Sequence, residues 1–224
     1  MDLANFSEEL TEFLPVTLLS LALTVTGSLW IDRLYLQEQN STLLSFPEQV
    51  TERAKYRKLL LFLLLLFCIV KAWNRFSLPV LFYYVAAVAF LSFVVVTDFE
   101  QYVIFDNMLL PFSIIGLCYT AYMNLPLFNH IAAALSGGLL FLLLAIATKG
   151  AIGGGDIKLI AAMGLWLGIR PLLSVIGYGF LAGGAAALFL LLTKQKQRHD
   201  FFAYGPYFAL SGIGLLLEWF RKLF

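Results

Sequence analysis

Apolar runs separated by short polar breaks recur along almost the whole chain. Most runs approach the ~20 residues that a helix needs to cross the hydrocarbon core of a bilayer. The pattern therefore predicts an all-α, polytopic membrane protein with about eight transmembrane helices. The expected spans are residues 14–31, 59–73, 78–96, 108–123, 131–147, 157–167, 171–192 and 208–220. The sixth is too short to cross the bilayer alone.

Composition agrees with this pattern and excludes an ordinary soluble domain. Hydrophobic residues make up 61% of the 224 positions and charged residues only 13%. The 15 basic and 14 acidic residues nearly cancel, and no basic face with interleaved aromatic residues suggests nucleic acid. The two cysteines, Cys68 and Cys118, lie inside apolar runs, so we expect neither a disulfide framework nor a metal site.

The chain shows no internal repeat and no linker long enough to separate a second domain. Residues 1–224 are therefore expected to form one membrane-embedded domain with a short cytoplasmic loop at 32–58. Acidic residues, and no Lys or Arg, precede the first apolar run, so it does not resemble a cleavable signal peptide.

The distribution of Lys and Arg predicts an N-terminus outside the cytoplasm, because cytoplasmic loops carry an excess of these residues. In that orientation, ten of the 15 basic residues lie on the inner side. These are Arg33, Arg53, Lys55, Arg57, Lys58, Lys149, Lys158, Lys194, Lys196 and Arg198. The outer segments hold the other five.

Two acidic residues stand out at the ends of apolar runs. Asp98 ends the third expected span and Asp156 opens the sixth. Two spans separate them, and an even number of crossings returns the chain to the same membrane face. Because carboxylates near the bilayer core are costly, they suggest function. Two neighbouring carboxylates can share one proton, so that one activates water while the other polarises a carbonyl.

Three glycines, Gly153, Gly154 and Gly155, precede Asp156. Glycine permits a positive φ angle and close approach of another backbone, so this run is suited to binding an extended peptide beside Asp156. A flexible turn between helices is the alternative interpretation of the glycines alone.

Four stretches resemble the type IV prepilin peptidases and the related preflagellin peptidases, which are membrane aspartic proteases with a GxGD signature. GGGDIKL at 153–159 resembles the segment with the second catalytic aspartate, and DFEQYVIFD at 98–106 resembles the segment with the first. GSLWIDRL at 27–34 and YGPYFAL at 204–210 are similar to the exit of the first helix and the entry of the last. The resemblance implies eight spans, with Asp98 and Asp156 as catalytic residues.

The resemblance also implies a function. We expect an endopeptidase of the bacterial inner membrane that cuts leader peptides from prepilins or pseudopilins of type IV pilus or type II secretion systems at the cytoplasmic face. Hydrolysis by two carboxylates requires no cofactor and no metal. Besides these substrates the expected partner is the lipid bilayer, and pairing of the chain with itself is left open.

This sequence departs from the family pattern at several positions. Phe105 stands where the family often has Pro, and Gly150 and Ile152 replace an acidic residue and Met. Many relatives also carry zinc-binding cysteine pairs in the first inner loop, associated with methylating the new N-terminus. Residues 32–58 contain no cysteine, so methyltransferase activity is not expected.

Three charged residues near the two aspartates are candidates for shaping the loop or contacting substrate: Glu100, Asp106 and Lys158. Two other function classes fit part of the pattern. A small transporter would use the two aspartates to bind a proton or cation, and would be revealed by ion-dependent uptake without proteolysis. An inactive assembly factor for a pilus or secretion complex would keep the fold without turnover.

Overall fold

The computed structural model describes residues 3–39, 42–150, 152–194 and 202–223, and these residues form helices and connecting turns without strands. The all-α prediction is confirmed. The helices are α1 (Leu3–Glu38), α2 (Val50–Arg53), α3 (Arg57–Ala72), α4 (Leu78–Gln101), α5 (Asp106–Tyr122), α6 (Leu127–Ala147), α7 (Gly154–Leu167), α8 (Ile169–Leu192) and α9 (Gly205–Leu223). Short 3₁₀ turns at Pro47–Gln49 and Ala54–Tyr56 flank α2.

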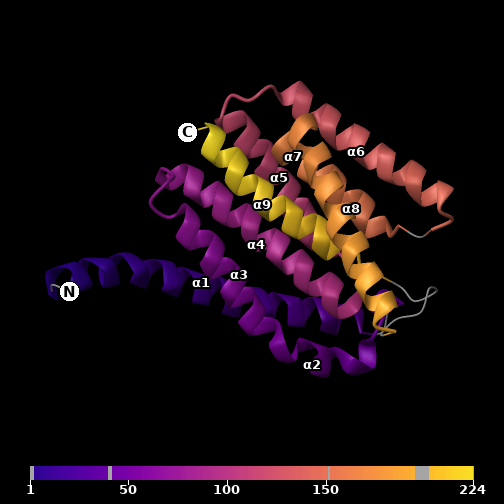
Figure 1. Cartoon of the computed structure of the whole chain (residues 1–224), viewed down its shortest axis with the longest axis horizontal. Coiled ribbons are helices and arrows are strands. Elements are labelled where there is room, and N and C mark those ends of the chain that lie inside the picture. Colours follow the sequence, from indigo (N-terminus) through magenta and orange to yellow (C-terminus); the bar gives the residue numbers. More distant parts are fainter. Residues whose placement is uncertain (1–2, 40–41, 151, 195–201, 224) are drawn as a thin grey trace.

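Helices α4 to α9 pack into one bundle, with α1 and α3 along one side (Figure 1). Helix α4 packs against α3, α5 and α9, and α7 packs against α5, α6, α8 and α9. The N-terminal part of α1 extends away from the bundle (Figure 1). The two helices that carry the predicted catalytic aspartates therefore each contact several neighbours.

Four helices of the described chain are long and apolar enough to cross a membrane: α1 from Phe13, α4, α6 and α8. By this measure the predicted count of eight spans is wrong, although each of the eight apolar segments lies in a helix to within one residue. Helices α3, α5 and α7 have only 16, 17 and 14 residues, while α9 carries Glu218 and Arg221 near its end. Several of the expected spans were thus apolar runs whose helices are shorter than the ~20 residues that cross a bilayer core.

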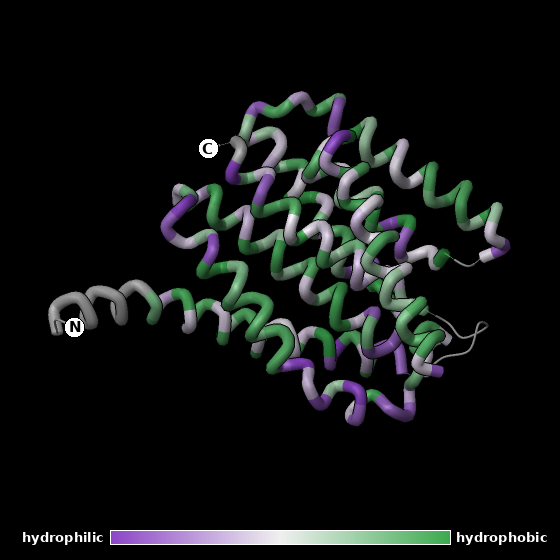
Figure 2. Tube along the Cα trace, in the orientation of Figure 1, coloured by the Kyte–Doolittle hydropathy of each residue, from purple (hydrophilic) through white to green (hydrophobic). Residues whose placement is uncertain are grey.

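The burial of these four candidate spans separates the centre of the bundle from its periphery. The most apolar window of α4 is 78% buried, whereas the corresponding windows of α6 and α8 are only 22% buried. Apolar residues follow the helices throughout, and hydrophilic residues gather at helix ends and in connections (Figure 2). Helices α6 and α8 thus present apolar surface outward, as lipid-facing helices do.

Helix α7 is held in the bundle by close contacts with its neighbours. Trp166 stacks on Phe112 and Tyr119 of α5 and donates a hydrogen bond of 2.9 Å to the Phe112 carbonyl. A Cβ atom on Gly164 would lie 2.5 Å from the backbone nitrogen of Ala134 in α6. Small residues permit this close helix approach, which fixes the position of the short helix that carries Asp156.

Candidate active site

Asp98 lies in the last turn of α4 and is 6% exposed. The helix ends at Gln101 and is capped by Tyr102, whose φ of 54° is left-handed and whose backbone N–H donates a 3.0 Å hydrogen bond to the Asp98 carbonyl. A left-handed residue commonly terminates a helix, although glycine is more usual there. Asp98 is consequently placed only three residues before the helical end.

Asp156 lies in the first turn of α7, where a negative side chain is favoured by the helix dipole. Gly153 precedes the helix in an extended conformation with φ of −70°, and its carbonyl accepts a 3.1 Å hydrogen bond from the Asp156 backbone N–H. Among the described glycines only Gly150 and Gly168 have a positive φ, so the run at 153–155 does not use the positive φ that glycine permits. Close packing accounts for one of the three glycines, because a Cβ on Gly155 would lie 2.9 Å from the Cβ of Ile104.

The fold brings the two aspartates together around Ile104 and Gly205. A Cβ on Gly205, at the start of α9, would lie 2.6 Å from Oδ2 of Asp98 and 3.0 Å from Cδ1 of Ile104. Ile104 in turn faces Gly155, next to Asp156. The Asp156 carboxylate is close enough to act electrostatically on Asp98. The site is therefore assembled from α4, α7, the start of α9 and the connection before α5.

Each aspartate has one buried carboxylate oxygen without a hydrogen-bond partner among the described residues: Oδ2 of Asp98 and Oδ1 of Asp156. Buried polar atoms normally have partners, because an unsatisfied one is costly. Such atoms are suited to bind a water molecule, a shared proton or a polar group of a substrate.

A cavity of about 480 Å³ opens beside Asp156. Its lining includes the three predicted glycines, Gly153, Gly154 and Gly155, together with Asp106 and Lys158. Asp98 is not among the lining residues. Lys158 Nζ donates hydrogen bonds of 2.8 and 2.7 Å to the two carboxylate oxygens of Asp106, and both side chains are more than half exposed. This pair joins α7 to the start of α5 at the edge of the cavity.

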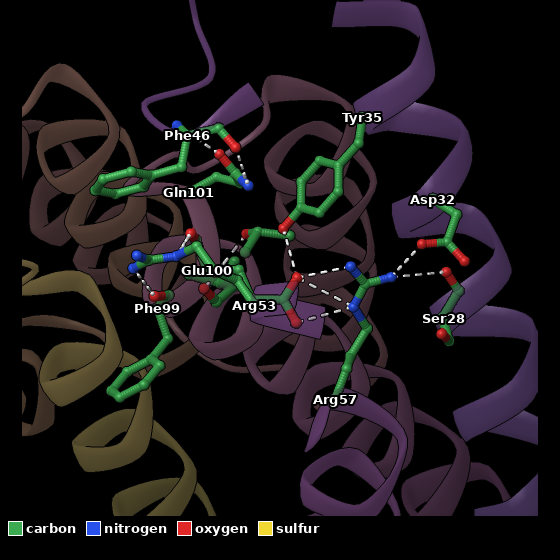
Figure 3. Close-up of polar contacts among 11 residues, drawn as sticks. Ser28, Asp32, Tyr35, Phe46, Arg53, Arg57, Phe99, Glu100 and Gln101 are labelled. Carbon is green, nitrogen blue, oxygen red and sulfur yellow. Dashed lines mark hydrogen bonds and ion pairs between the residues drawn. The ribbon is translucent and has the colours of Figure 1, made fainter. Parts of the chain in front are cut away.

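Glu100, also predicted near the substrate, does not line this cavity. Its carboxylate is buried and accepts hydrogen bonds from Arg57 Nε (2.9 and 3.1 Å), Arg57 Nη2 (2.7 Å) and the Tyr35 hydroxyl (3.0 Å). Arg57 also forms an ion pair with Asp32 of α1 (Figure 3). The structure therefore places Glu100 on the side of α4 that faces α1 and α3.

Sequence reasoning missed the partners of Glu100, above all Arg57 and Tyr35. Arg57 was counted only as one of several basic residues of an inner loop, yet its side chain is 2% exposed. The available signal was its position two residues before the apolar run at 59–73, which places its charge in the first turn of the helix. Among the described residues, no three His, Cys, Asp or Glu side chains are grouped as a metal site would require.

Residues 85–188 match the type IV leader peptidase family. The matched residues run from α4 into α8 and contain both Asp98 and Asp156. The Gly205 contact and the partners of Glu100 lie outside the matched segment.

Curated relatives carry a matching name. The chain is 36% identical over 130 residues to a prepilin leader peptidase/N-methyltransferase of Neisseria gonorrhoeae, covering 55% of this chain and 44% of that protein. It is 31% identical over 143 residues to the protein of that name in Bacillus subtilis (strain 168), covering 62% and 57%, and 27% identical over 146 residues to one in Aeromonas salmonicida (strain A449), covering 62% and 48%. The chain thus spans about half the length of the curated relatives that it matches. No solved structure gives a significant match.

Proposed function

We propose that this chain is a member of the type IV leader peptidase family and a membrane aspartic endopeptidase that cleaves leader peptides from prepilins or pseudopilins. The observation that carries the proposal is the meeting of Asp98 and Asp156, two buried carboxylates within the family segment, each with an oxygen that has no partner among the described residues. The relatives named prepilin leader peptidase supply the substrate class.

In the proposed reaction the two aspartates act as a dyad that holds one proton. The ionised carboxylate removes a proton from water, and the resulting hydroxide forms a bond to the scissile carbonyl carbon. The protonated carboxyl donates its proton to the carbonyl oxygen, giving a tetrahedral diol. Breakdown of the diol breaks the C–N bond, transfers a proton to the leaving amine and returns a single shared proton to the pair.

The cavity beside Asp156 is the proposed binding site for the leader junction. An extended peptide binds by main-chain hydrogen bonds, which require close backbone approach. Gly154 has no neighbouring atom within 4 Å of a Cβ position, so the lining there is open to a peptide. Asp106 and Lys158, at the edge of the cavity, are proposed to contact the substrate or to hold the loop shape.

The proposed location is the bacterial inner membrane with the N-terminus outside and the active site facing the cytoplasm. The arrangement of the helix ends supports this orientation. The ends of α4 and α6 and the start of α9 lie at one side of the bundle, and the α3–α4 connection, the start of α1 and the end of α9 lie at the other (Figure 1). Lys149 and Lys194 lie on the side of Asp98, in agreement with the predicted basic inner face. Lys196 and Arg198, also used in that prediction, lie outside the described residues.

Cleavage of purified prepilins tests the proposal. Asp98→Asn and Asp156→Asn are each expected to abolish cleavage, because one carboxylate cannot both activate water and protonate the carbonyl. Glu218→Gln is the matched control, since Glu218 is an exposed acid paired with Arg221 on α9. The detergent-purified proteins are incubated with a panel of prepilins and the products identified by mass spectrometry.

Cleavage that persists in either asparagine variant would contradict the shared-proton mechanism. Ion uptake into proteoliposomes without any proteolysis would favour a transporter, and a folded protein that does neither would favour an assembly factor. In the same reactions, labelled S-adenosylmethionine is expected to leave the products unlabelled. The cysteine-free loop at 32–58 supports this peptidase-only proposal, and methyl transfer to the new N-terminus would overturn it.

A further inference from the structure

The last turn of α4 is bound on two sides, and only one of them is the candidate active site. Asp98 faces Gly205 of α9, while Glu100, two residues later, faces α1 and α3. Two residues in a helix differ by roughly 200° around the axis and by about 3 Å along it. A rotation or unwinding of this turn that moves Glu100 must therefore also move Asp98.

The Glu100 side of the turn carries a buried charge network (Figure 3). The side chains of Arg57 and Glu100 are 2% and 6% exposed, and Asp32, the second acid on Arg57, is 50% exposed. Burying an ion pair is costly, and removing one partner leaves an uncompensated charge. Among the described residues Arg57 is the only cation that contacts the Glu100 carboxylate, and the Tyr35 hydroxyl supplies a further hydrogen bond.

The segment before α3 also binds the backbone at the end of α4. The last carbonyls of a helix have no partner within the helix, and Arg53 donates to those of Glu100 (2.5 Å) and Phe99 (3.3 Å). The Gln101 side chain accepts a hydrogen bond of 2.9 Å from the Phe46 N–H and donates one of 3.1 Å to the Phe46 carbonyl. Without such contacts this terminal turn would be the part of α4 most prone to fraying.

From these contacts we infer that Arg57 is a positioning residue for the peptidase reaction. Its ion pair with Glu100 holds the terminal turn of α4 in the orientation that places the Asp98 carboxylate against Asp156. The inference rests on the proposed function, and it assigns Arg57 a role in catalysis although its ion pair lies on the side of α4 that faces α1 and α3. Arg57 acts through Glu100 and the helix, and it does not contact the substrate.

Substitution of the pair separates positioning from simple stability. Arg57→Gln leaves the Glu100 charge buried without a cation, and is expected to lower kcat by ~10-fold to ~100-fold with KM unchanged, as expected for a small displacement of a catalytic group. The double variant Arg57→Gln with Glu100→Gln removes both charges and is expected to recover kcat to within roughly 10-fold of the wild type. Arg57→Lys keeps the charge but loses the fork of hydrogen bonds, so an intermediate kcat is expected.

The control is Arg75→Gln, which removes an exposed arginine near the other end of α3. Prepilin cleavage is measured at a temperature where thermal unfolding shows every variant fully folded, so that loss of folded protein does not lower kcat. Recovery in the double variant with a normal KM supports the inference. An Arg57→Gln variant that melts earlier but retains the wild-type kcat would show a purely structural role and overturn it.

Other outcomes assign a different cause. If Glu100→Gln alone raises KM and leaves kcat unchanged, Glu100 contacts the substrate and the positioning role is wrong. If the wild type cleaves no prepilin, the proposed function fails and this inference fails with it. A wild type that cleaves, beside an equally active Arg57→Gln variant, overturns the inference alone.

Discussion

Gly154 and Gly155 are adjacent in sequence but have different surroundings at the entry to α7. A Cβ on Gly155 would meet the Cβ of Ile104 at 2.9 Å, whereas a Cβ on Gly154 would meet no atom within 4 Å. Gly155 is therefore needed for packing within the protein itself. Gly154 leaves space in the cavity, and only a bound substrate would require that space.

Alanine substitutions should separate these two requirements. Gly155→Ala is expected to displace Ile104 or the start of α7, and with it Asp156, so kcat and the melting temperature should both fall. Gly154→Ala is expected to raise KM without lowering the melting temperature, because its methyl group obstructs only the peptide. Gly177→Ala, also open around its Cβ position, is the control. Steady-state cleavage and thermal unfolding in detergent measure both effects, and an unchanged KM in Gly154→Ala would argue against close approach of the peptide there.

Among single residues, the sequence singled out positions where a charge interrupts apolar surroundings. Asp98 and Asp156 were predicted from that contrast and from the resemblance, and the fold brings them together, while their catalytic role stays a prediction. The sequence did not determine the conformation of the glycine run, because three glycines permit many backbone angles and packing selects among them. Glu100 was grouped with the substrate residues because sequence distance does not reveal which side of a helix faces which neighbour.

Helices α6 and α7 form the closest helix pair around the site. Gly164 of α7 lies against the backbone of Ala133 and Ala134, and Gly116 of α5 lies under the Trp166 ring. Contacts with backbone atoms cannot be relieved by a side-chain rotation. The short separation of α6 and α7 therefore depends on Gly164 having a hydrogen atom where alanine would have a methyl group.

Gly164→Ala is expected to destabilise the protein by about 1–3 kcal/mol or more, the usual cost of overpacking, because the added Cβ would lie 2.5 Å from the Ala134 nitrogen. Gly214→Ala in α9 is the matched control, since its Cβ position is open. Alanine in a helix interior is otherwise favoured over glycine by roughly 0.5–1 kcal/mol, so the control should be neutral or slightly stabilised. Unfolding of both variants in detergent gives the difference, and equal stabilities would contradict the packing argument.

The sequence predicted the existence of these elements better than their lengths. Each expected apolar segment lies in a helix to within one residue, since hydropathy marks positions that avoid water. It does not mark where a helix ends inside the protein, and α7 has only 14 residues. The network at the end of α4 was also beyond prediction, because its members come from α1, α3 and α4 and meet only after folding.

For the whole molecule, the arrangement of the helix ends makes the proposed orientation in the membrane testable. Ser77, before α4, and Thr148, after α6, lie at opposite ends of the bundle and are both exposed. If the active site faces the cytoplasm, Thr148 lies inside together with Asp98, and Ser77 lies outside. The orientation can thus be determined from which of these two side chains is accessible from outside the cell.

Single-cysteine labelling of the full chain tests this orientation. Ser77→Cys and Thr148→Cys are introduced singly into a Cys118→Ala background, because Cys118 is exposed and Cys68 is buried. In intact spheroplasts a membrane-impermeant maleimide is expected to label Ser77→Cys and to leave Thr148→Cys unlabelled until the membrane is permeabilised. The parent should stay unlabelled throughout, and each variant must still cleave prepilin. The reverse labelling pattern would place Asp98 and Asp156 outside the cytoplasm, where the proposed enzyme would act only on the part of its substrate that had already crossed the membrane.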